Sequence, residues 1–395
     1  MPLLGPKYKP IVGLDIGTSM VHAMEIRPSG ATWKLHKWHQ APLPPAFLGD
    51  GKIKKSDEAV QFIKNFHKEG KFSTNKVALS VGGPSIICKK ILVDKMTEMD
   101  LEDQISLEAE EYIPFDLEEV FLDFQILGDA DDKMAVLLTA CKKDFVNDKL
   151  DICRQAGLTP TVLDLDVFCL ANALSAFEPT PKAAKKSFLW KKNKQKNTSP
   201  IPNTANINHI PPTTGSNKAD TSKESTDRII AVVNIGSQNM NTIILVGNTI
   251  DYTRDLAFGA KSMISDIMEQ TGLSQDETQK SLQHPPDQST PAPLQDAWET
   301  IVKPFEEKLA QQIRQSLDYF QSTRLHKEQP QQILLCGGGA AIAGIHLRIG
   351  QFLSLPVEVF NPILKLKRGL GQKGPVSEQA SGFTVSLGLA LRGVS

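Results

Sequence analysis

The sequence predicts an α/β protein in which one domain occurs twice, and three observations lead to this prediction. The stretches IVGLDIGTS (11–19) and AVVNIGSQN (231–239) share one layout: an apolar strand, an acid or its amide, an apolar residue, a glycine and small polar residues. Each begins a run of three short strands, followed by segments with the apolar period of a helix. A triple glycine at 337–339 comes directly after a further strand of the second copy.

Length and composition fit a globular protein with two domains. The chain has 395 residues, 40% of them hydrophobic, which is enough to fill two cores. Its formal net charge of −1 gives no general attraction to nucleic acid, so we expect no nucleic-acid partner. The five cysteines stand singly without CxxC spacing, which favours reduced, buried thiols. No apolar run approaches the ~20 residues that cross a bilayer, and the N-terminus lacks a signal pattern, so we expect a cytoplasmic protein.

The first half is expected over residues 1–177. It starts with strands at 10–16, 20–27 and 32–39, and DEAVQFIKNF then has the apolar stripe of a helix. KVALSVGG returns to a strand and ends in a Gly-Gly turn. Further helices are expected at 101–113, 143–155 and 167–177.

Residues 178–227 are expected to form a disordered basic and polar insert, because they have almost no apolar periodicity. Within it, 182–196 holds seven lysines, no acids and the trio Phe188, Leu189 and Trp190. Three interpretations stay open: a solvated linker, contact with an anionic membrane surface, and a site for an acidic partner.

The second half is expected over residues 228–395. Three strands start at Arg228, and helices follow at 259–271 and 274–283. A longer apolar stripe runs from Leu294 to Phe320, and Pro304 is expected to kink this helix or to begin its second part. The strand QILLCGGG and a helix at 377–392 complete the repeat.

The repeated turns have the chemistry of a phosphate site. Glycine lets backbone N–H groups approach an anion closely, and neighbouring hydroxyls add donors. Two such turns facing each other would grip a di- or triphosphate, with an acid at the strand end holding hydrated Mg²⁺. The candidate residues are Asp15, Gly17, Thr18 and Ser19 in the first turn, Asn234, Gly236 and Ser237 in the second, and Gly337, Gly338 and Gly339 in the third element. Asp15 is the metal candidate.

These motifs resemble the actin, Hsp70 and sugar-kinase fold, a duplicated ribonuclease H-like α/β fold. Within it the sequence is similar to PilM, the actin-like protein of type IV pilus assembly that is related to FtsA. The stretches that carry the likeness are LEDQISLEAEEYIPFDLEEVFLDFQIL (101–127), AGLTPTVLDLDVFCLANAL, DYTRDLAFGAKSMISDI, KPFEEKLAQQIRQSLDYF and CGGGAAIAGI. The resemblance implies ATP and Mg²⁺ as cofactors and a small extra subdomain at about 77–142. It also implies a cytoplasmic scaffold at the inner membrane that docks the N-terminal peptide of a PilN-like membrane protein and connects it to the pilus motor ATPase.

The sequence departs from the family pattern at three places. Asn234 replaces the usual acid of the second loop; an amide carries no charge and cannot act as a base. His22 stands where relatives have a lysine or another polar residue. On the helix that contacts the nucleoside, Gln279 keeps a ribose hydrogen bond available, whereas Leu282 does not replace a lysine. We therefore expect at most a weak ATPase, and the interpretation that the turns bind no nucleotide stays open.

Other functions of the same fold also remain open. The peptide groove of the resemblance is assigned to Ile113, Pro114 and Phe115, although packing under the subdomain explains these residues equally well. A filament-forming, FtsA-like division protein is one alternative. A small-molecule kinase is another, and it would need a catalytic acid that the sequence does not reveal.

Overall fold

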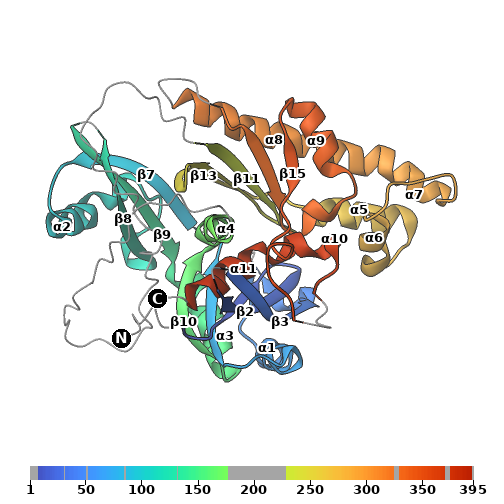
Figure 1. The fold of residues 1–395 in the computed structure, drawn as a ribbon, viewed down its shortest axis with the longest axis horizontal. Helices are drawn as coiled ribbons and strands as arrows, with labels where there is room; N and C mark the ends of the chain where they lie inside the picture. Colours follow the sequence, from blue (N-terminus) through green and yellow to red (C-terminus); the bar gives the residue numbers. More distant parts are fainter. Residues whose placement is uncertain are drawn as a thin grey trace.

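The structure, a computed structural model, describes residues 8–30, 32–49, 52–83, 86–130, 132–176, 228–323, 329–369 and 374–393. Figure 1 shows two α/β halves, one below and one above right, and a small subdomain at the left. The basic stretch 182–196 falls outside the described residues, so its three interpretations stay as they were.

The first half contains a five-stranded sheet in the order β10-β6-β1-β2-β3. β1 pairs with β2 antiparallel and with β6 parallel, so the expected hairpin strands adjoin a parallel pair. The strands are β1 (Val12–Ile16), β2 (Met20–Ser29), β3 (Thr32–Pro42), β6 (Lys76–Val81) and β10 (Thr159–Leu165), with a short ribbon of β4 (Leu48–Gly49) and β5 (Lys52–Ile53) beside them.

The second half repeats this topology strand for strand. Its sheet has the order β13-β12-β11-β14-β15, so β11 takes the place of β1 and β14 that of β6. The strands are β11 (Ile229–Ile235), β12 (Met240–Val246), β13 (Thr249–Leu256), β14 (Gln332–Cys336) and β15 (Val357–Val359). The duplicated α/β fold is therefore confirmed.

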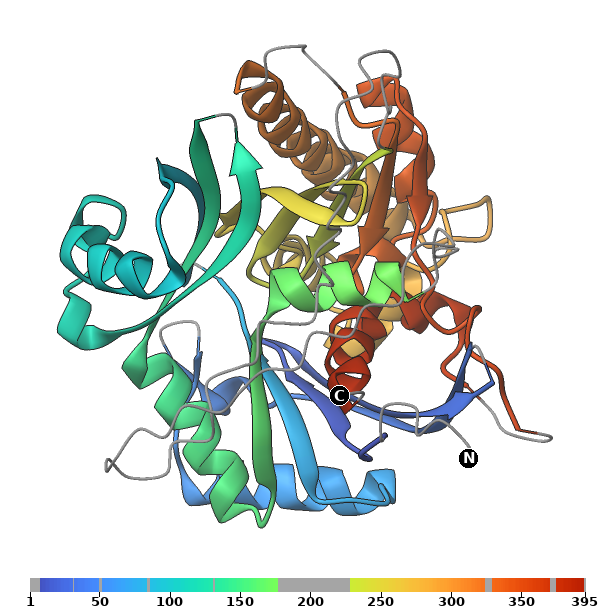
Figure 2. The same cartoon turned by 60° about the vertical axis from the view of Figure 1, so that its left-hand side comes forward.

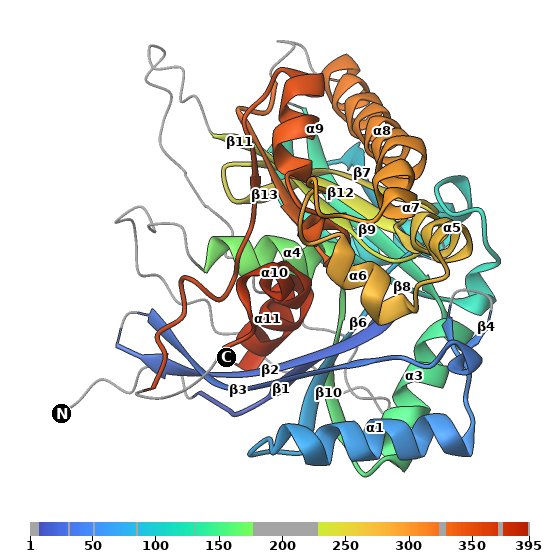
Figure 3. The same ribbon diagram turned by 90° about the vertical axis from the view of Figure 1, so that its right-hand side faces the viewer.

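Helices cover the outer face of each sheet (Figure 3). On the first sheet these are α1 (Asp57–Gly70) and α3 (Lys143–Gln155), whose Ile63, Phe66 and Leu150 join its outer core. The second sheet is covered by α5 (Lys261–Thr271), α6 (Gln275–Ser281), α7 (Ala292–Ala297), α8 (Lys303–Ser322) and α9 (Ile345–Leu353). Central strands such as β11 are thus buried on both faces, which explains their unbroken apolar run.

Two helices lie between the sheets and join the halves (Figure 2). They are α4 (Asp166–Ser175), which reaches across to β12, and α11 (Thr384–Ala390), which packs on β1; the short α10 (Ser377–Ala380) precedes α11. A Cβ at Gly388 would lie 2.0 Å from Cys169 O, and one at Gly13 would lie 2.0 Å from Ser386 O. Glycines at these two crossings therefore allow each half to end on the other.

The small subdomain is a three-stranded sheet, β7-β9-β8, with one helix on its outer face. Its elements are β7 (Ile86–Asp94), α2 (Glu98–Glu108), β8 (Val120–Ala130) and β9 (Lys133–Lys142). The boundary expected near 77 differs from this, because β6 pairs with β1 and β10 in the large sheet and the separate sheet begins at Ile86.

The long helix of the second half is interrupted near the expected proline. A π-helical turn, Trp298–Val302, joins α7 to α8, and Pro304 is the second residue of α8. Proline has no N–H to donate to the preceding turn, so the local hydrogen-bond pattern changes there without ending the helix.

Candidate functional site

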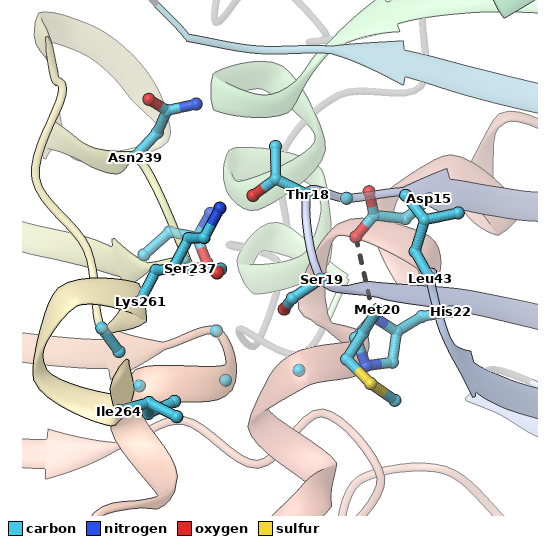
Figure 4. A pocket seen from close by; sticks show the side chains of 18 of the residues that line it. Asp15, Thr18, Ser19, Met20, His22, Leu43, Ser237, Asn239, Lys261 and Ile264 are labelled. Carbon is cyan, nitrogen blue, oxygen red and sulfur yellow. Dashed lines mark ion pairs between the residues drawn. The ribbon is translucent and has the colours of Figure 1, made fainter. Parts of the chain in front are cut away.

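A cavity of about 470 Å³ lies between the two halves, where β1, β6, β11 and β14 end. Figure 4 shows Thr18 and Ser19 on one side of the gap and Ser237 on the other. Every residue expected to touch the nucleotide lines this one cavity: Asp15, Gly17, Thr18, Ser19, Asn234, Gly236, Ser237, Gln279, Gly337, Gly338 and Gly339.

The first two glycine turns have the same geometry. Gly17 N donates to Met20 O at 3.1 Å, and Gly236 N donates to Asn239 O at 2.9 Å. A Cβ at Gly17 would lie 2.9 Å from Met20 O, and one at Gly236 would lie 2.7 Å from Asn239 O, both too close for a side chain. The two turns therefore need glycine for their tightness, which brings their backbones to the cavity.

The third glycine element packs directly on the second turn. Gly337 has φ +82°, and a Cβ there would lie 2.4 Å from Asn234 Oδ1. A Cβ at Gly339 would lie 2.3 Å from the Ile235 side chain, whereas Gly338 faces open space. The triple glycine thus gives close contact on two sides and a bare backbone surface on the third.

A polar pair bridges the two strands of each hairpin at equivalent positions. Asp15 is opposite His22, and Asn234 is opposite Asn241. His22 Nδ1 lies 4.0 Å from Asp15 Oδ2 (Figure 4), but burial lowers the pKa of His22 to about 4. The imidazole is therefore neutral at pH 7 and does not supply the positive charge that a lysine would bring there.

Two charged residues of the cavity, Asp166 and Lys149, were not predicted from the sequence. Burial is the main cause that raises the pKa of Asp15 to about 7; repulsion by Asp166 adds to it and Lys149 opposes it. Burial likewise raises the pKa of Asp166. Lys149 Nζ donates to Ser80 O at 2.7 Å and to Ile16 O at 3.3 Å, which holds its charge beside both acids.

A sequence signal existed for only one of these residues. Asp166 begins α4 directly after the parallel strand β10, the end of a strand at which ligands bind in open α/β sheets. Lys149 sits in the middle of a helix whose other charged residues are exposed or partly exposed, so its burial shows only in the fold.

The remaining wall of the cavity is mostly apolar. It contains Ile264, Met268 and Ile342, with Gln275 and Gln279 as polar groups. Leu282 is 4% exposed and joins the core of the second half, so its aliphatic side chain has a packing role in place of the lysine of relatives.

Among the described residues, no three His, Cys, Asp or Glu side chains are grouped so that they could hold a metal ion. The cavity does bring together the carboxyl groups of Asp15 and Asp166. Two carboxylates suit Mg²⁺, which keeps several waters and takes few protein ligands.

The residues expected in a peptide groove lie at the subdomain with different exposures. Ile113 is 3% exposed and belongs to the subdomain core, so it has no surface for a peptide. Phe115 is half-buried with Lys142 Nζ 4.7 Å from its ring centre, and Pro114 is exposed. Only the last two residues remain available for contact.

Within the described part of the chain, no helix is both long and apolar enough to span a bilayer.

Comparisons with known proteins agree with this architecture. A solved structure described as a PilM-PilN type IV pilus biogenesis complex matches with a TM-score of 0.75 and 24% identity, over 98% of this chain and 100% of that one. The ethanolamine utilization protein EutJ from Carboxydothermus hydrogenoformans matches with a TM-score of 0.49 and 14% identity, over 98% and 90%. MreB5 of Spiroplasma citri bound to AMPPNP matches with a TM-score of 0.47 and 12% identity, over 98% and 96%.

The fold is the actin-like one that the sequence resemblance implied, and pilus assembly is favoured over the division-protein and kinase alternatives. The family model described as "Type IV pilus assembly protein PilM" matches residues 13–189 and 216–394. The match covers most of the chain, and the chain therefore belongs to the PilM family of type IV pilus assembly proteins.

Proposed function

We propose that this type IV pilus assembly protein is an ATP-binding scaffold at the cytoplasmic side of the inner membrane, where it docks the N-terminal peptide of a PilN-like membrane protein. The observation that carries the proposal is the convergence of two matching glycine turns and a triple glycine on one cavity. A cavity of about 470 Å³ is of the size that holds a small-molecule cofactor.

The walls of the cavity suit the two ends of a nucleotide. The hydroxyl groups of Thr18, Ser19 and Ser237 are donors for phosphate oxygens. The bare backbone at Gly338 and the apolar side chains around Ile342 would hold a flat base, and Gln279 would reach the ribose.

Asp15 and Asp166 are the residues that would hold Mg²⁺, which would neutralise phosphate charge when bound. Both carboxyl groups have raised pKa values, first because they are buried and, for Asp15, also because Asp166 repels its charge. A divalent cation at this place would offset their repulsion and stabilise their ionised forms.

ATP hydrolysis should be slow. Asn234 has no negative charge, and its Nδ2 donates to Asn241 Oδ1 at 3.0 Å. The amide is therefore engaged in holding the hairpin and cannot accept a proton from an attacking water. Phosphoryl transfer depends on metal, donors and a positioned water together, so the loss of one acid favours binding without rapid turnover.

Docking of a PilN-like peptide is supported by membership of the PilM family and by the fold shared with the PilM-PilN complex. The small subdomain offers an outer strand, β8, whose single neighbour in its described sheet is β9. Pro114 and Phe115 lie just before β8 and are the apolar residues that a peptide added along this edge would meet. A link to the pilus motor ATPase belongs to the same proposal.

Thermal unfolding tests the nucleotide part. ATP should raise the melting temperature only when Mg²⁺ is present, and Asp15→Ala should abolish the rise. Asp318→Ala, which removes an exposed acid on α8, should keep it. An absence of any shift in the unaltered protein would reject nucleotide binding.

Co-purification tests the peptide part. The cytoplasmic tail of a PilN-like protein should bind the unaltered protein, and Phe115→Asp should weaken binding at least ~10-fold, the loss of one well-packed aromatic contact. Leu107→Asp is the matched control, because Leu107 is an 82% exposed apolar residue on α2 of the same subdomain. Equal binding by both variants would move the docking site elsewhere.

A further inference from the structure

The positive charge that faces the cavity from the second half comes from Lys261. Among the described residues lining the cavity, the charged side chains are those of Asp15, Asp166, Lys149 and Lys261, because His22 is neutral at pH 7. Figure 4 shows the Lys261 side chain beside Ser237, across the gap from Thr18 and Ser19.

The two lysines differ in their surroundings. Lys149 is buried, donates to two backbone carbonyls and stands beside the two acids, so its charge is already balanced. Lys261 is exposed, and its ammonium makes no hydrogen bond or ion pair with any residue that the structure describes. It is therefore the cation that remains available to a ligand.

The place of Lys261 in its helix makes a purely structural role unfavourable. Lys261 is the first residue of α5, which has no acidic residue in its first turn. A cation at a helix N-terminus opposes the helix dipole, so this lysine costs local stability. Residues that break a local rule without a compensating contact are characteristic of functional sites.

We propose that Lys261 binds the phosphate chain of the nucleotide and makes the cavity selective for nucleoside di- and triphosphates over nucleosides. This inference rests on the proposed nucleotide function. Lys261 would thus supply, from the second half, the positive charge that His22 does not supply from the first. An ammonium group is suited to this, since it pairs with phosphate as a mobile point charge.

The test is a direct binding measurement on the full chain with ATP, ADP and adenosine, each with Mg²⁺, and with inorganic tripolyphosphate. Lys261→Gln should weaken ATP, ADP and tripolyphosphate binding at least ~10-fold, which is about 1.4 kcal/mol. Adenosine affinity should change less than about twofold, and Lys261→Arg should keep most of the ATP affinity. Lys280→Gln, a loss of the same charge on the neighbouring α6, should leave all affinities unchanged.

The outcomes separate this inference from the function on which it rests. Lys261→Gln should melt no lower than the unaltered protein without ligand, since the removed cation opposed the helix dipole. If the variant keeps full ATP affinity, or loses adenosine affinity equally, the role of Lys261 is rejected while nucleotide binding stands. If the unaltered protein binds none of the nucleotides, the proposed function itself fails.

Discussion

Asn234 and Asn241 form in the second half the counterpart of the Asp15 and His22 pair in the first. Asn234 Nδ2 donates to Asn241 Oδ1 at 3.0 Å, and Asn241 Nδ2 donates in turn to Asp255 Oδ1 at 2.5 Å. Asn234 therefore begins a chain of hydrogen bonds that crosses three strands and ends on a carboxylate. The amide that replaces the family's acid fits this chain, because an ionised acid has no hydrogen to donate to Asn241.

Asn234→Asp should destabilise the protein at pH 7.5 by about 1–3 kcal/mol, the cost of a buried polar group without a partner. The new carboxylate has no hydrogen to give, so Asn241 must turn its amide and then presents oxygen to Asp255. Burial raises the pKa of Asp255 to about 6, so at pH 5 Asp255 is protonated and can donate. Urea unfolding should therefore show a penalty that shrinks as the pH falls from 7.5 to 5.

The double variant Asn234→Asp with Asp255→Asn is the control for that prediction. The amide introduced at position 255 would donate to Asn241, and Asn241 would donate to the carboxylate introduced at position 234, so the chain would run in the opposite direction. Stability at pH 7.5 should return to within about 1 kcal/mol of the starting value. A penalty equal to that of the single variant would show that the hydrogen-bond chain is not the cause.

Asp15 should make the ligand-free protein less stable as the pH rises. Burial, with repulsion by Asp166, raises the pKa of Asp15 from 3.8 to about 7, so the folded protein holds this proton more tightly than the unfolded chain. Stability must then fall between about pH 4 and pH 7. In EDTA, the free energy of unfolding should decrease from pH 5 to pH 8, and Asp15→Asn should make the decrease shallower. Asp318→Asn should keep the original slope; a shared slope in all three proteins would contradict the assignment.

The glycine turns could be predicted from the sequence because their chemistry is local. Gly17 and Gly236 each accept a geometry that their own hairpins require, and the same spacing occurs twice. The shared cavity followed from the duplication, since two copies of one turn meet when the halves face each other.

Residues whose role depends on distant packing could not be predicted in the same way. Lys149 enters the cavity because α3 packs against the first sheet and leaves its ammonium group beside Ser80 O and Ile16 O. Ile113 was expected at the surface although it continues the spacing of Leu101, Ile105 and Ala109 by four residues. That helical spacing indicates the core, and the structure places Ile113 there.

Arg348 should be more important for stability than its partner Glu306. Glu306 is 3% exposed and forms a two-fold ion pair with Arg348, whose Nη2 also donates to Ala343 O at 2.7 Å. Arg348→Met leaves a buried carboxylate without its cation and should cost about 3–5 kcal/mol in urea unfolding. Glu306→Gln with Arg348→Met should recover most of this, because no buried charge is left. A double variant as unstable as Arg348→Met would show that packing by the arginine, and not its charge, is responsible.

The small subdomain should be held to the second half by two contacts between β7 and β13. Thr253 Oγ1 donates to Cys88 O at 2.8 Å, and Lys90 Nζ lies 2.7 Å from Asp251 Oδ1. A neutral hydrogen bond and a half-exposed ion pair are each worth about 1 kcal/mol. Thr253→Val with Asp251→Asn should therefore speed amide hydrogen exchange in β7 about tenfold, while α2 keeps its protection.

The same two contacts start from β13, the strand that also carries Asp255, so they connect the hydrogen-bond chain of the cavity to the subdomain. If ATP orders that chain, it should slow exchange in β7 of the unaltered protein and have a weaker effect in the double variant. Thr249→Val, on the same strand but outside these contacts, should respond to ATP as the unaltered protein does. Equal ATP protection in all three proteins would mean that the nucleotide reaches the subdomain without these two contacts, because both are removed in the double variant and kept in the other two proteins.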